Sequence, residues 1–196
     1  MAAAGLTQST SRPARGGWLP AGLPGAWLRA YIAIWVGTLA FAAIVALTGP
    51  TLAILAHEHA RLALSPDLTP SPGAGHVLVL LALNLPVAAW PLLLGVIDAH
   101  RHRLSRRLAD MLLLACFTRN VLWVGAALGT YGAALLAYIP QLPLEWAGLA
   151  LGASSWLVQR RRPLIVPLHE RLVWLASTAG VLLLAAILET VAVPHQ

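Results

Sequence analysis

Long apolar runs separated by short polar connections make up most of this chain. A helix that crosses a membrane needs about 20 mostly apolar residues. Five segments reach or approach that length, so we predict an all-α, polytopic transmembrane bundle of about five spanning helices. The fourth segment is short for a span, about 24 Å by helix rise, and is expected to be tilted little or packed inside the bundle. The predicted spans are Ala30–Ala56, His76–Ile97, Val121–Ile139, Pro143–Val158 and Leu172–Val193.

The segment before the first span is rich in Ala, Gly, Ser, Pro and Arg and contains no long apolar run. We predict that residues 1–28 form a flexible cytoplasmic tail and that residues 29–194 form a single transmembrane domain. The first span is overlong and contains Gly49 and Pro50, which predict a kink or a tilt.

Composition supports a lipid environment. Hydrophobic residues make up 59% of the chain and charged residues only 10%, whereas soluble domains contain about 25% charged residues. All 13 basic residues are arginines. They cluster between the apolar runs, which indicates membrane orientation rather than nucleic-acid binding. The lone Cys116 excludes an internal disulfide and is interpreted as a small packing residue.

The arginines predict the orientation, because connections on the cytoplasmic side contain more Arg and Lys. Connections with many arginines alternate with connections that have few: only Arg61 follows the first span, and the connection at Pro140 has no arginine. This pattern places the N-terminus inside the cell and the C-terminus outside. The arginine-rich connections contain Arg12, Arg15 and Arg29; Arg101, Arg103, Arg106 and Arg107; and Arg160, Arg161, Arg162 and Arg171.

An amphipathic segment, LSRRLADMLLLACF (residues 104–117), precedes the third span. Two interpretations remain open: a short interfacial or re-entrant helix, or the beginning of an overlong third helix. Arg119 and Asn120 then mark the entry into lipid, with Arg119 as an inner-side anchor. The alternative is that Arg119 is the buried partner of Asp98 or Asp110.

Three polar side chains from different predicted helices fall in the outer half of the membrane: Asn84, Glu145 and Glu189. A carboxylate in hydrocarbon costs a few kcal/mol unless it is protonated, paired or hydrated. We therefore predict an intramembrane polar cluster. Candidate partners on the same side are His57, His59, Arg61 and His76.

Each of these residues also has a structural explanation. Glu145 follows Pro143 at a helix start, where exposed amide hydrogens and the helix dipole favour a negative charge. Asn84 is of a type that often joins membrane helices by hydrogen bonds, and Gly125 and Gly129 suggest a close helix contact. Glu189 has the weakest structural explanation, because its helix end disfavours a negative charge.

Enzymatic motifs have little support. In the stretch HEHARL, His57 and His59 are two residues apart, whereas a metalloprotease helix needs histidines four apart. The chain contains neither a phosphate-binding loop with lysine nor a GxSxG motif. We predict no enzyme activity, no metal and no cofactor. An intramembrane hydrolase using Glu145 and an outer-loop histidine is the remaining enzymatic alternative.

Asparagine, glycine, proline and glutamate positions across residues 30–194 form a recognisable order: Asn84, Gly95, Asn120, Gly125, Gly129, PxxxxE from Pro140 to Glu145, Ala147, Gly152, AAILET and Pro194. This order resembles the stage II sporulation protein M family. That family has an asparagine-bearing helix, a Pro-His-Gly-x-x-Glu motif that opens a helix, and a closing Ala-x-x-x-Glu segment. Glu145 and Glu189 match its acidic positions. Gln141 and Leu142 replace its His-Gly, so a role of that histidine is not expected here.

The resemblance implies a polytopic protein of the bacterial inner membrane that works with other proteins. Family members anchor cell-wall hydrolases during engulfment, and others occur beside transporter genes in peptide export. We therefore expect a scaffold or partner subunit whose partners are lipid, other membrane or cell-wall proteins, or a second copy, and not nucleic acid. The alternative is a transport or export component with a polar path lined by Asn84, Glu145 and Glu189.

Overall fold

The computed structural model describes residues 22–48, 74–96, 102–132, 135, 140–161 and 166–192. Within these ranges the regular elements are five helices, and no strand occurs among them. Four of the helices are long and apolar enough to cross a membrane, which confirms the predicted helical membrane bundle. The helices are α1 (Leu23–Thr48), α3 (Ala74–Val96), α4 (Arg103–Tyr131), α5 (Leu142–Gln159) and α6 (Leu168–Ala192), and α5 is the one outside the four.

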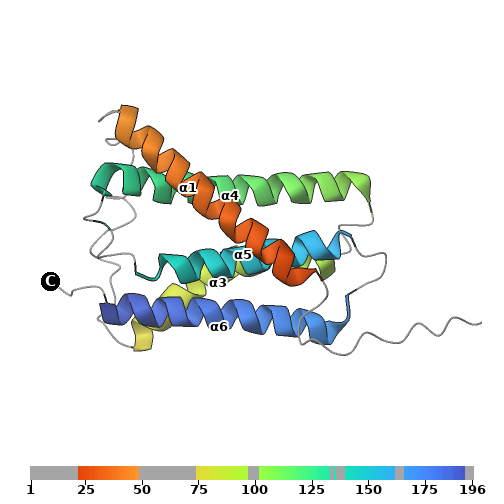
Figure 1. The fold of residues 1–196 in the computed structure, drawn as a ribbon. Helices are drawn as coiled ribbons and strands as arrows, with labels where there is room; N and C mark the ends of the chain where they lie inside the picture. The colour runs from red at the N-terminus through yellow and green to blue at the C-terminus, as the bar shows by residue number, and fades with distance from the viewer. Residues whose placement is uncertain are drawn as a thin grey trace, which may run out of the picture.

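Successive helices run in opposite directions, so the bundle has two distinct ends (Figure 1). α3 and α5 begin at the end where α1, α4 and α6 finish. We call this the carboxylate end, because it includes Glu145 near the start of α5 and Glu189 near the end of α6. The opposite end contains Arg106 near the start of α4 and Arg160 and Arg161 just after α5, and we call it the arginine end.

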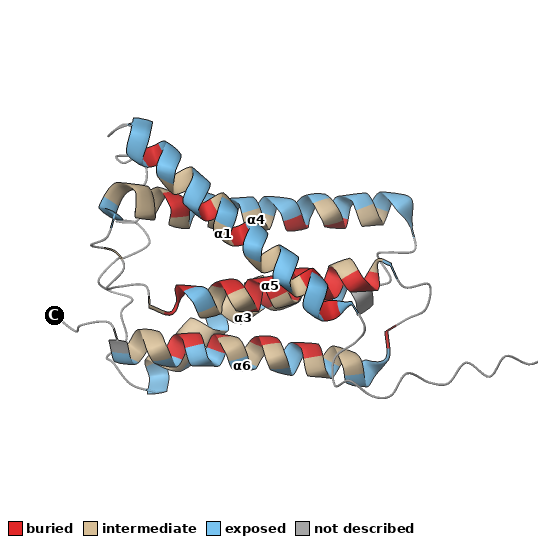
Figure 2. Ribbon diagram, viewed as in Figure 1, coloured by how far each residue is buried: buried red, intermediate tan, exposed pale blue. Residues whose placement is uncertain are grey.

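The short α5 is the central helix of the bundle. It packs against α1, α3 and α6, and 12 of its 18 residues are buried. Figure 2 shows this concentration of buried residues, whereas the outer faces of the longer helices are exposed. These faces present large apolar side chains such as Leu47, Leu83 and Leu114, as expected where lipid covers the surface. Packing inside the bundle, one of the two predictions for this segment, is confirmed.

Small residues allow the neighbouring helices to come close to α5. A Cβ at Gly148 would lie 2.8 Å from the Leu182 side chain of α6, and one at Gly152 would overlap the Ala88 carbonyl oxygen of α3. Ser154 and Ser155 are buried, and their hydroxyls donate to carbonyls of α5 itself. These two hydroxyls are therefore satisfied within α5 and need no partner from a neighbouring helix.

Glycines also allow close contact between α1 and α4. A Cβ at Gly125 would lie 2.8 Å from the Thr38 carbonyl oxygen, and one at Gly129 would lie 2.5 Å from the Ala42 carbonyl oxygen. The predicted helix contact at these two glycines is confirmed. Nearer the arginine end, α1 crosses away from α4 (Figure 1).

The third predicted span has different boundaries in the structure. α4 is one continuous helix of 29 residues that begins at Arg103. The amphipathic segment 104–117 is therefore the beginning of an overlong helix, which confirms one of the two interpretations, and not a separate interfacial or re-entrant helix. The helix starts well before Val121, the predicted start of the span. The helix ends at Tyr131 rather than Ile139, and the next residue, Gly132, has a positive φ of 56° that favours glycine.

The other boundaries agree more closely. α3, α5 and α6 begin and end within about four residues of the predicted spans. α1 begins at Leu23, so residues 23–28 of the predicted tail are helical. The predicted kink at Gly49 and Pro50 lies outside the described residues.

We predict opposite effects for the same substitution at two glycines. Gly152→Ala places a methyl group against the Ala88 carbonyl and should lower the free energy of unfolding by about 1–3 kcal/mol. Gly180→Ala is the matched control, because no atom lies within 4 Å of its added Cβ, and alanine favours a helix by up to about 1 kcal/mol over glycine. Unfolding in mixed micelles measures both. Equal effects would contradict the close contact between α5 and α3.

Candidate functional site at the carboxylate end

The first polar contact at the carboxylate end joins α3 to α5. The Asn84 side-chain amide donates a hydrogen bond of 3.4 Å to the Glu145 carboxylate. Glu145 lies in the first turn of α5, which has a proline near its start and Gln141 as the preceding residue. Asn84 lies ten residues into α3, about 15 Å along the helix. Two of the three residues in the predicted cluster are therefore in contact.

The third residue, Glu189, lies near the end of α6 and interacts electrostatically with both neighbouring helices. It lies within electrostatic range of the Glu145 side chain of α5 and of His76, two residues into α3. The structure therefore brings Asn84 and Glu145 into contact, with Glu189 near Glu145 and His76 near Glu189. The other candidate partners, His57, His59 and Arg61, lie outside the described residues.

A cavity of about 70 Å³ adjoins the Asn84–Glu145 contact. Its lining combines apolar side chains with Asn84, Glu145, Asn120 and Trp146. The Trp146 side chain is buried, and its indole N–H has no hydrogen-bond partner in the described part of the chain. The volume is well below the roughly 300–1,000 Å³ of typical organic ligand sites, but it exceeds the roughly 10–15 Å³ that a water molecule requires. The cavity therefore suits water, a proton or a small cation.

Asn120 is in a different place from the one predicted. We expected an inner-side anchor at the beginning of the third span, but α4 starts at Arg103, so Asn120 lies about 25 Å along the helix. Its side-chain amide donates to the Cys116 carbonyl at 2.8 Å, and the residue lines the cavity. It is a fourth member of the polar site, missed because the start of α4 was placed too late.

Arg119 is exposed on α4 beside Asn120, likewise far from the start of the helix. It is not the partner of Asp110, since the Asp110 carboxylate forms a 2.8 Å ion pair with Arg160. Asp98, the other acidic residue considered as a partner, lies outside the described residues.

A second polar contact, at the arginine end, was not predicted. The Asp110 carboxylate accepts hydrogen bonds from Arg160 at 2.8 Å and from the Trp156 indole at 2.9 Å. These bonds join α4 to α5. The sequence did indicate that Asp110 and Arg160 both lie near the predicted inner surface. The position of a residue along its helix does not show which side chain on another helix it faces, so the pair could not be predicted.

No metal centre is evident in the described ranges: no group of three or more His, Cys, Asp or Glu side chains is placed to hold an ion. The polar groups around the cavity at the carboxylate end are the half-buried Glu145 carboxylate, two amides and an indole N–H. Such a set can hold a helix in place, bind water, or accept and release a proton.

Comparison with known proteins returned no match to a family model, to a curated protein or to a solved structure. The resemblance to the stage II sporulation protein M family therefore depends on the sequence positions given above.

We predict that Asn84 and Glu145 are energetically coupled. Asn84→Leu removes the donor to the carboxylate and should lower stability by about 0.5–1.5 kcal/mol, the range for hydrogen bonds between membrane helices. Combined with Glu145→Leu, the loss should be smaller than the sum of the single losses. Thr178→Val is the control, because its hydroxyl bonds to the Trp174 carbonyl within α6 and the residue does not line the cavity. A double-mutant cycle in mixed micelles measures the coupling, and additive losses would contradict the contact.

Proposed function

We propose that this chain is a non-enzymatic integral membrane protein that acts as a scaffold or partner subunit in a complex of the bacterial inner membrane. This role follows the resemblance to the stage II sporulation protein M family. In it, the five helices cross the bilayer with the N-terminus in the cytoplasm and the C-terminus outside. The partners are other membrane or cell-wall proteins.

The observation that supports this role best is the use of polar groups to connect helices. Asn84 of α3 bonds to Glu145 of α5, and Asp110 of α4 bonds to Trp156 and Arg160 at the other end of α5. The Trp27 indole of α1 also donates to a carbonyl of α5, at 3.2 Å. A central helix tied to its neighbours at both ends forms a rigid framework, as a scaffold requires.

Charge supports the proposed orientation. The described arginines other than Arg119 belong to segments at the arginine end, either at helix starts or just after α5. Arginine near helix ends is enriched on the cytoplasmic side. With the arginine end in the cytoplasm, the carboxylate end and its polar cluster face outward, toward the cell wall.

One observation favours a second candidate, a transport component. Glu145 adjoins a small cavity shared with Asn84 and Asn120, and a half-buried carboxylate of this kind can relay protons. A path through Asn84, Glu145 and Glu189 would suit protons or small cations, because about 70 Å³ does not admit a peptide.

Glu145→Gln distinguishes the two functions. The glutamine carbonyl can still accept the Asn84 hydrogen bond, so a scaffold should keep its abundance and its crosslinked partners. A transporter should instead lose proton or cation flux in vesicles while keeping its abundance, because an amide does not release a proton. Glu170→Gln at the arginine end is the control for loss of a carboxylate.

Purification in mild detergent after crosslinking in cells provides the readout for the scaffold. A wild-type chain that elutes alone from such cells would contradict the scaffold role. Flux that survives Glu145→Gln would exclude the transport role.

A further inference from the structure

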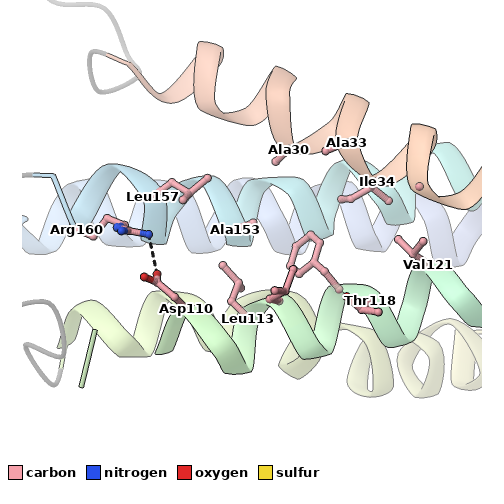
Figure 3. Close-up of a pocket in the computed structure, with 13 residues that line it drawn as sticks. Ala30, Ala33, Ile34, Asp110, Leu113, Thr118, Val121, Ala153, Leu157 and Arg160 are labelled. Carbon is pink, nitrogen blue, oxygen red and sulfur yellow. Dashed lines mark hydrogen bonds and ion pairs between the residues drawn. The ribbon is translucent and has the colours of Figure 1, made fainter. Parts of the chain in front are cut away.

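A groove of about 490 Å³ lies between α1, α4 and α5, toward the arginine end. Small and apolar side chains such as Ala33, Leu113 and Phe117 line most of it. The Asp110–Arg160 pair lies at one end, as Figure 3 shows. The groove exists because α1 contacts α4 closely at Gly125 and Gly129 and diverges from it on the other side of the crossing (Figure 1).

The length of the groove matches one leaflet of a bilayer. Its lining residues on α4 extend from Asp110 to Val121, which is about 16 Å along a helix. Half of a hydrocarbon core about 30 Å thick is about 15 Å. A single acyl chain that enters beside Asp110 and Arg160 can therefore lie along the groove to the middle of the membrane.

A second concavity, of about 330 Å³, adjoins the charged end of this groove. Arg106, Arg160, Arg161 and Leu157 line it, and Leu157 and Arg160 also line the groove. Three positively charged guanidinium groups are present here, and one of them, that of Arg160, is paired with the Asp110 carboxylate. This mouth is therefore positively charged, and arginine is the side chain best suited to bind phosphate oxygens.

We propose that this groove and its mouth bind one anionic phospholipid. One acyl chain lies between α1 and α4, and the phosphate is held by Arg106 and Arg161, with Arg160 kept in position by Asp110. Basic pockets between membrane helices at the cytoplasmic surface bind anionic headgroups in this way. The binding itself requires neither the scaffold role nor the transport role, so its test is independent of both.

Native mass spectrometry of the delipidated, full-length protein tests the proposal. Phosphatidylglycerol and phosphatidylcholine with identical acyl chains are the probes. We expect tighter binding of phosphatidylglycerol, weakened roughly fivefold for each arginine removed in Arg106→Gln and Arg161→Gln, with phosphatidylcholine little changed. Equal binding of the two lipids, or a preference that survives the double substitution, would overturn the proposal.

The groove is tested separately. Ala33 is exposed and lines it, so Ala33→Trp should fill it and weaken binding of both lipids. Ala43→Trp, an exposed position of α1 outside the lining, should leave binding unchanged. If Ala33→Trp does not fold, Thr118→Trp fills the groove from α4. Unchanged binding in the folded groove variant, or displacement of the lipid by glycerol phosphate at equal concentration, would show that the acyl chain is not held there.

Discussion

The close approach of α5 to α3 and α6 is the contact on which the rest of the structure depends. Lipid tails are as apolar as leucine, so no hydrophobic force draws membrane helices together, and close packing must do so. Gly148 and Gly152 remove the side chains that would hold Leu182 and Ala88 away. Asn84 lies one turn before Ala88 on α3, and Glu145 lies about two turns before Gly152 on α5. The glycine contact and the hydrogen bond are therefore on the same helix faces, and the first positions the second.

α4 is held in a different way. It packs chiefly on α1, and its polar link to α5 is the Asp110 carboxylate, which reaches Trp156 and Arg160. A bond made by long side chains spans helices that are not in close contact, whereas a glycine contact requires them to touch. The groove beside Asp110 lies where the backbones of α4 and α5 stay apart and the two helices meet through side chains, among them Leu113 and Trp156. The same arginine thus belongs both to the link between helices and to the mouth of the groove.

The sequence predicted α3, α5 and α6 well because polar or helix-breaking residues flank their apolar runs. It placed α4 poorly, because Arg106, Arg107 and Asp110 lower the hydropathy of a segment that is nonetheless helical. Entry into lipid and the start of a helix are different events, and hydropathy reports only the first. The start of α1 was missed for a related reason. Pro24 and Gly25 resemble a loop, yet proline is favoured in the first turn of a helix.

The sequence could predict the candidate site as far as the depth of each residue in the membrane determines which residues come near each other. Counting residues from the ends of α3, α5 and α6 was enough to group Asn84, Glu145 and Glu189, whereas Asn120 needed the true start of α4. Depth does not decide which face of a helix a residue occupies, and the partner of Asp110 shows why this matters. Arg119 follows Asp110 by nine residues, which is about 2.5 turns, so the two side chains leave α4 on opposite faces. Asp110 can therefore turn toward α5 and Arg160, while Arg119 is exposed on the outside of the bundle.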